Sequence, residues 1–238
     1  MKSIWPILAG LFLASCLSKS IERETHRSPI ARLMEGNKRY VKSDLNHPNQ
    51  SMKRLKEISE AQQPFAVVVS CSDSRVPPEI IFDQGLGDLF VIRTAGNVIG
   101  DYEMASIEYA VMKLHCKVVM VMGHEKCGAI ESFANHPNSN FPGHLNAIKD
   151  FILSEPFAEQ VLKDSLDHNY HAVIHNIIYG VQFLKKESVV IKQQFDEGAL
   201  DIYGAIYHLK TGQVQVIEEN VNTKMDSTSV DSIPVTVH

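Results

Sequence analysis

The sequence predicts an α/β fold built around a parallel sheet. Two apolar runs, residues 65–69 and 117–123, are short, rich in valine and bounded by polar residues. This pattern is typical of strands that are buried on both faces of a parallel sheet. Apolar residues recur at helical spacing between the two runs and after them. Strands that alternate with such stretches indicate crossover helices within one α/β unit.

The composition is that of an ordinary globular protein. The chain has 238 residues, which suits one α/β domain or at most two small ones. Hydrophobic residues make up 44% and charged residues 21%. A net charge of −5, without a basic stripe, argues against a nucleic-acid partner. Four cysteines do not make a disulfide framework in a chain of this size.

The first 16 residues resemble a secretory signal. Lys2 precedes an apolar run, residues 4–14, that is too short to span a bilayer comfortably. The run ends in Leu13-Ala14-Ser15-Cys16, which resembles a bacterial lipobox, where the cysteine is lipidated. The alternatives are an ordinary signal cut nearby and an N-terminal helix of a cytosolic protein. We expect export to the periplasm, with lipidated Cys16 as a membrane tether.

The rest of the chain divides into a tether, one folded domain and a tail. Residues 17–28 are charged and polar and predict the tether, and residues 29–218 predict the domain. Helices are expected at residues 29–40, 52–61, 79–83, 102–114, 128–135, 145–166 with a break at Pro156, and 168–195. Strands are expected at residues 65–69, 89–93, 117–123, 198–209 and 213–217, the last two forming a hairpin. The polar residues 219–238 predict a disordered tail.

Chemically reactive side chains follow the two buried strands. Cys71, Asp73 and Arg75 come after the first strand, and His124 and Cys127 come after the second. Ligands gather at the carboxyl ends of the strands in open α/β sheets, so we expect these side chains to meet there. Two thiolates and one imidazole are ligands for Zn²⁺ and leave its fourth position open, as in catalytic zinc sites. The sequence therefore predicts one zinc site at the strand ends.

The motif Cys71-x-Asp73-x-Arg75, followed by His124-x-x-Cys127, resembles the β-class carbonic anhydrases. The likeness continues through residues 90–97 and 106–110 and covers roughly residues 29–217. It implies a mostly parallel central sheet with helices on both faces and a C-terminal antiparallel strand. It also implies that Cys71, His124 and Cys127 bind zinc and that Asp73 and Arg75 form a catalytic dyad beside the metal.

The resemblance also implies a substrate pocket and an oligomer. Gln62 falls where the plant-like subgroup has a glutamine that binds substrate from the neighbouring subunit. Phe90, Tyr109, Ala95 and Gly128 fall at positions beside the metal or in the apolar pocket, with Ala95 where a valine is common. The implied assembly is an obligate homodimer or a dimer of dimers.

The implied reaction is the reversible hydration of carbon dioxide to bicarbonate and a proton. A hydroxide on the zinc would attack carbon dioxide while Asp73, held by Arg75, orients it. In a second subgroup of the family the aspartate itself occupies the fourth zinc position. Gln62 matches the open subgroup, so we expect an open site at neutral pH.

Several other interpretations remain at this point. An enzyme of the same fold acting on carbon disulfide or carbonyl sulfide would need nearly the same site. A non-catalytic zinc protein would be expected to lack Asp73 or Arg75, and both are present. Phe90 and Tyr109 also fit ordinary core positions. His168, His171 and His175 have the spacing of a second metal site, although a solvated helix face or a dimer contact is the preferred interpretation.

Overall fold

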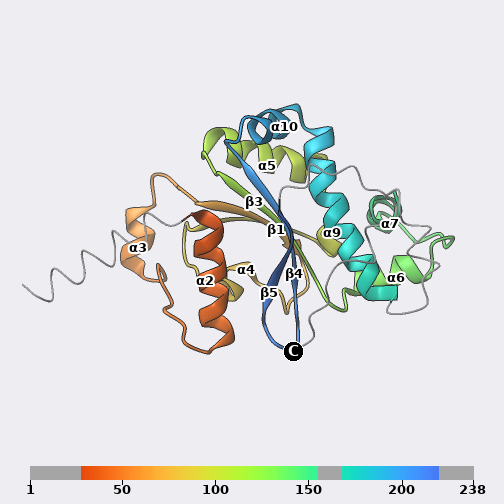
Figure 1. The fold of residues 1–238 in the computed structure, drawn as a ribbon, viewed down its shortest axis with the longest axis horizontal. Helices are drawn as coiled ribbons and strands as arrows, with labels where there is room; N and C mark the ends of the chain where they lie inside the picture. Colours follow the sequence, from red (N-terminus) through yellow and green to blue (C-terminus); the bar gives the residue numbers. More distant parts are fainter. Residues whose placement is uncertain (1–27, 155–167, 220–238) are drawn as a thin grey trace, which may run out of the picture.

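A five-stranded sheet forms the centre of the computed structural model, which describes residues 28–154 and 168–219 (Figure 1). In spatial order the strands are β2 (Leu89–Thr94), β1 (Ala66–Cys71), β3 (Val118–His124), β4 (Asp201–Tyr207) and β5 (Val214–Glu219). The first four are parallel, and β5 runs antiparallel to β4. The predicted fold class is therefore confirmed.

Helices cover both faces of this sheet (Figure 1). One face carries α2 (Pro29–Val41) and α4 (Pro78–Ile81), with α3 (Met52–Glu57) at the edge of the domain. The other face carries α5 (Asp101–Lys113), α6 (Gly128–Asn135), α7 (Leu145–Leu153), α9 (His168–Glu187) and α10 (Val189–Asp196).

Alternation along β1 and β3 divides the core into two layers. Val67 and Val119 point toward the α5–α10 side, whereas Val68 and Met120 point toward α2 and α4. Every residue of both strands is buried. This double burial explains why both strands read as continuous apolar runs rather than alternating ones.

Glycines mark a close approach of helix α9 to the sheet. A β-carbon on Gly123 of β3 would lie 2.7 Å from the Ile177 side chain, and one on Gly180 of α9 would lie 3.1 Å from Val121. The glycine inside the predicted long helix thus allows the helix to pack against the strand that ends in His124.

Two predicted helices differ from those observed. The region expected to be helical at 168–195 is divided at Ser188, whose hydroxyl caps α10 by accepting the amide of Ile191 and also donates to Glu108 of α5. The helix expected at 52–61 ends at Glu57, where the Ser59 hydroxyl bonds the Lys56 carbonyl.

Some predictions fall outside the described residues. These are the signal and tether through residue 27, the second half of the 145–166 helix and the tail from residue 220. Residue 219, which was predicted to begin the tail, is instead the last residue of β5. Within the described ranges, no helix has the length and apolar character needed to cross a membrane.

Asn37 on α2 joins three parts of the fold. Its buried amide donates to the carbonyls of Ile81, at 3.2 Å, and Gly212, at 2.8 Å. Its oxygen accepts the amide of Val214 at 2.8 Å. One side chain thus ties α2 to the end of α4 and to the turn that leads into β5.

We expect Asn37→Leu to lower the free energy of unfolding by at least about 2 kcal/mol, because it leaves buried backbone groups without partners. Urea denaturation of the full chain measures this change. Asn135→Leu, at an exposed amide that pairs with Asn169, is the control and should change stability by less than about 0.5 kcal/mol. Equal effects of the two substitutions would contradict the role given to Asn37.

Candidate metal centre

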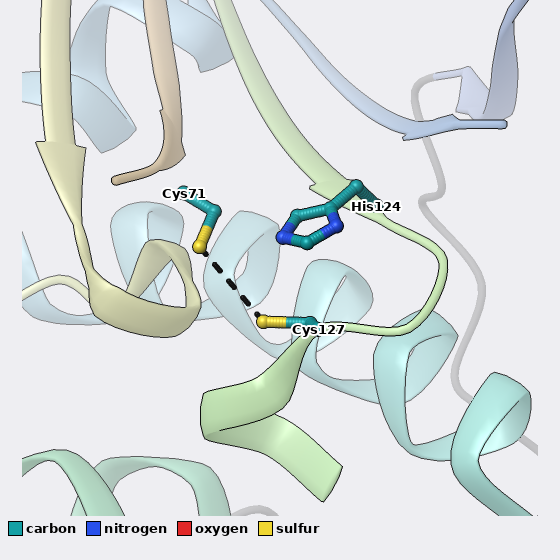
Figure 2. Close-up of side chains that lie close together, drawn as sticks. All are labelled: Cys71, His124 and Cys127. Carbon is teal, nitrogen blue, oxygen red and sulfur yellow. Dashed lines mark hydrogen bonds between the residues drawn. The ribbon is translucent and has the colours of Figure 1, made fainter. Parts of the chain in front are cut away.

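The three predicted metal ligands converge at the carboxyl edge of the sheet (Figure 2). Cys71 is the last residue of β1 and His124 the last of β3, and these strands are neighbours. Cys127 immediately precedes α6 as its N-cap residue. The ligand atoms of the three side chains all lie within 4.8 Å of one another, and all three residues are buried.

The spacing of the sulfur atoms fits a shared zinc ion. The two Sγ atoms are 3.8 Å apart. Two thiolates bound tetrahedrally to one Zn²⁺, with Zn–S bonds of about 2.3 Å, are separated by about 3.8 Å. The chain folds with these sulfurs already at the distance that one zinc ion requires.

His124 is also oriented as a ligand. Its Nδ1 lies 2.8 Å from the carbonyl oxygen of Glu125, an acceptor, so Nδ1 carries the proton. Nε2 is therefore left with a lone pair, and it is buried with no hydrogen-bond partner among the described residues. A buried nitrogen of this kind is costly unless it is bound. A metal ion beside the two sulfurs would satisfy it.

The two thiols interact strongly with each other. A hydrogen bond from Cys127 lowers the pKa of Cys71 to about 4. The same bond, reinforced by burial, raises the pKa of the Cys127 thiol. Two neighbouring thiolates repel one another, and a divalent cation between them removes that repulsion. The thiol pair is thus suited to a cation.

Asp73 and Arg75 form an ion pair next to the ligands. Arg75 Nε donates to Oδ1 at 2.9 Å and Nη2 to Oδ2 at 2.7 Å, and the Arg75 amide also donates to Oδ1. The Arg75 guanidinium lowers the pKa of Asp73 to about 2, so the carboxylate stays charged at neutral pH. Asp73 Oδ2 lies 3.9 Å from His124 Nε2. Among the described residues, the group of side chains close enough together to share a metal ion includes no carboxylate.

Further residues that the sequence analysis did not assign hold this site. Arg93 of β2 donates to the main-chain carbonyls of Cys71, at 3.0 Å, and Asp73, at 2.7 Å. Glu125, between the two ligands of the second motif, pairs with His208 at 2.8 Å and accepts the Leu209 amide. Arg93 lies in the family-like stretch, but no local signal connects His208 with the metal ligands.

Two of the five predicted pocket residues lie at the same edge of the sheet. Ala95 follows Thr94, which pairs with Cys71 in the sheet, and it is exposed. Gly128 is the first residue of α6, next to Cys127, and a β-carbon there would meet nothing within 4 Å. Both positions leave room beside the metal ligands.

Within one chain, the other three pocket residues lie away from the ligands. Phe90 pairs with Val67, about 13 Å along the strand from the carboxyl edge. Its ring is 6.3 Å from that of Tyr109, which is 49% exposed. Gln62 is exposed and precedes the amino end of β1. One subunit therefore does not bring these side chains to its own metal centre.

Among the described side chains, Cys71, His124 and Cys127 are the one clustered ligand group, so His171 and His175 belong to no second cluster there. The His168 side chain lies outside the described part of the structure. His175 is buried within the chain, so the solvated helix face, one of the two preferred interpretations, does not hold for this residue. Burial, with the neighbouring His171, lowers the pKa of His175 to about 4.

The comparisons with known proteins agree with this site. The family model described as carbonic anhydrase matches residues 66–214. Carbonic anhydrase 2 of Mycobacterium tuberculosis is 38% identical over 185 residues, which cover 76% of this chain and 87% of that protein. The carbonic anhydrase of Mycolicibacterium smegmatis is 37% identical over 188 residues, covering 77% and 89%.

Solved structures show the same fold. The β-carbonic anhydrase CcaA superposes with a TM-score of 0.64 at 29% identity, covering 81% of this chain and 89% of that one. The β-carbonic anhydrase of Coccomyxa gives a TM-score of 0.60 at 28% identity, covering 68% and 75%. A tetrameric enzyme from Sordaria macrospora gives 0.61 at 23% identity, covering 68% and 85%, which shows the fold alone. The chain therefore belongs to the β-carbonic anhydrases, and it is an enzyme of that family.

Proposed function

We propose that this enzyme catalyses the reversible hydration of carbon dioxide to bicarbonate and a proton, with one zinc ion per subunit held by Cys71, His124 and Cys127. The observation that carries the proposal is the buried group of two sulfurs, 3.8 Å apart, and one imidazole nitrogen without a partner. An arginine-bound carboxylate lies beside this group. Zinc held there would supply Lewis-acid activation of a water molecule.

Asp73 orients the nucleophile in this proposal. Its carboxylate is charged at neutral pH and accepts a hydrogen bond from the reacting water, which aims the oxygen lone pair at carbon dioxide. Arg75 holds the carboxylate through both oxygens. Arg93 fixes the backbone from Cys71 to Asp73 by donating to the main-chain carbonyls of both residues.

We also propose that the enzyme belongs to the open-site subgroup, and the contacts between Asp73 and Arg75 support this. Asp73 would have to exchange three hydrogen bonds from Arg75 for a bond to zinc in order to close the site. Such charge-assisted bonds are stronger than neutral ones, so the Arg75-bound position is favoured at neutral pH.

The substrate pocket in our proposal is completed by a second copy of the chain. Gln62, Phe90 and Tyr109 are far from the ligands of their own subunit but accessible from outside it. Strand β2, which carries Phe90, is an edge strand and is only partly buried. Unprotected edges are a liability that a partner removes. Apolar rings from one subunit, next to Ala95 and Gly128 of the other, would suit a small uncharged substrate.

We further propose, from sequence alone, that residues 1–16 direct export and that Cys16 anchors the mature enzyme to a membrane. In a bacterial host, Cys16→Ser should leave export intact but release the enzyme from the membrane fraction. Cell fractionation with an antibody measures both. An equal share of wild-type and variant protein in the membrane fraction would contradict lipid anchoring.

The direct test of the function is stopped-flow hydration of carbon dioxide by zinc-loaded protein. We expect kcat/KM to rise from mildly acidic to mildly alkaline pH. The reason is that two thiolates neutralise the charge of zinc and acidify water less than the three imidazoles that give a water pKa of about 7. Asp73, with its pKa near 2, does not titrate in this range.

Asp73→Asn is the matched variant for this experiment, because it keeps the shape and removes the charge. It should lower kcat/KM by at least about 100-fold at every pH, at unchanged zinc content. A wild-type enzyme with a flat pH profile, or a variant as fast as the wild type, would contradict the roles proposed here.

The two-copy pocket predicts complementation between inactive subunits. Gln62→Ala and Asp73→Ala should each be weakly active alone. Refolded together, they should form mixed dimers in which one of the two sites has both native residues. Activity should then recover to about a quarter of the wild-type value, since half of the dimers are mixed and each has one native site. No recovery would mean that Gln62 does not act across a subunit interface.

A further inference from the structure

A chain of two hydrogen bonds links the sulfur of Cys71 to the middle of α9. The Gly96 amide donates to Cys71 Sγ at 3.3 Å, and the Gly96 carbonyl accepts from Asn176 Nδ2 at 2.9 Å. Both Gly96 and Asn176 are buried, and Asn176 is only 1% exposed. The three residues come from three separate parts of the chain: β1, the short helix η1 (Ala95–Asn97) and α9.

Gly96 needs an external partner to hold this geometry. Its φ of +72° lies in the left-handed region, which glycine enters without strain but does not prefer over its other conformations. The amide and the carbonyl of Gly96 belong to two peptide planes joined by its φ and ψ, so a bond that holds the carbonyl restricts the directions that the amide can take. The bond from Asn176 thus restrains Gly96 on the side opposite to the amide that donates to the sulfur.

An N–H donor to a metal-binding thiolate alters the charge that the thiolate delivers. Hydrogen bonds to an ionised acceptor are strong, and they draw electron density away from it. Groups outside the ligand shell tune a bound metal in this way. The effect matters most where two thiolates leave a zinc ion with little net charge, as the ligand set here would do.

We propose that Asn176 is a positioning residue for the metal centre. It holds the Gly96 peptide so that its amide is directed at Cys71 Sγ, which weakens electron donation from this thiolate to the metal. The inference rests on the proposed zinc site and goes beyond it by assigning a residue of α9 to the control of the metal's charge. A purely structural Asn176 would stabilise α9 packing and leave the electronic state of Cys71 unchanged.

The test uses Asn176→Leu, which keeps a similar shape but removes the donor. In the cobalt-loaded full chain, we expect the thiolate-to-cobalt charge-transfer band to move to lower energy, because Cys71 becomes a stronger electron donor. In the metal-free chain, NMR should show exchange of the Gly96 amide proton roughly tenfold faster than in the wild type. Asn176→Ala replaces this variant if leucine prevents folding.

Asn169→Leu is the control, because it changes an amide on the same helix that pairs with Asn135. It should leave both the band and the Gly96 exchange rate unchanged. An unmoved band in the Asn176 variant, or equal shifts in the variant and the control, would overturn the proposal. A wild-type chain that binds no cobalt would overturn the metal centre itself, and the Gly96 exchange rate in metal-free protein would still decide whether Asn176 holds the peptide.

Discussion

The parallel pairing of β1 and β3 is the constraint on which the site depends. Ser70 lies beside Met122, so the ends of the two strands fall at the same level and deliver Cys71 and His124 to one point. Burial on both faces fixes this register, because a slip of one residue would exchange the two core layers. The close packing of α9 against Gly123 adds a second restraint near the end of β3.

Fixed hydrogen-bonding groups, both donors and acceptors, orient the side chains of the centre. The Glu125 carbonyl sets the proton position on His124, and Arg75 keeps Asp73 charged and turned toward itself. In each case a backbone group or an arginine holds a side chain that would otherwise have several orientations. This is preorganisation of the kind that lowers the cost of reaching a transition state. The groups that hold these side chains come from β2 and from the loops that follow β1 and β3. This explains why the family-like motifs extend beyond the candidate ligands.

The strands and the convergence of the three candidate metal ligands could be predicted because their signals are local. Each of the two strands is an apolar run that ends in a reactive residue, Cys71 or His124. One short stretch of sequence therefore predicts both the buried strand and the side chain at its carboxyl end. The break at Ser188 could not be found in this way, since it depends on a bond to Glu108 in another helix. The hydrogen bond from Asn176 to Gly96 could not be predicted either, because it joins residues that no spacing rule connects. Gln62 and Phe90 lie away from the candidate metal ligands within one chain, so the roles proposed for them rest on family resemblance.

A crystal structure of the zinc-loaded enzyme at mildly alkaline pH tests the central claim most directly. Our account predicts zinc bound by Cys71, His124 and Cys127, a solvent molecule as the fourth ligand, and Asp73 still paired with Arg75. A zinc ion whose fourth ligand is an Asp73 oxygen, with the bonds to Arg75 broken, would contradict the open site. A zinc ion bound elsewhere would contradict the metal centre.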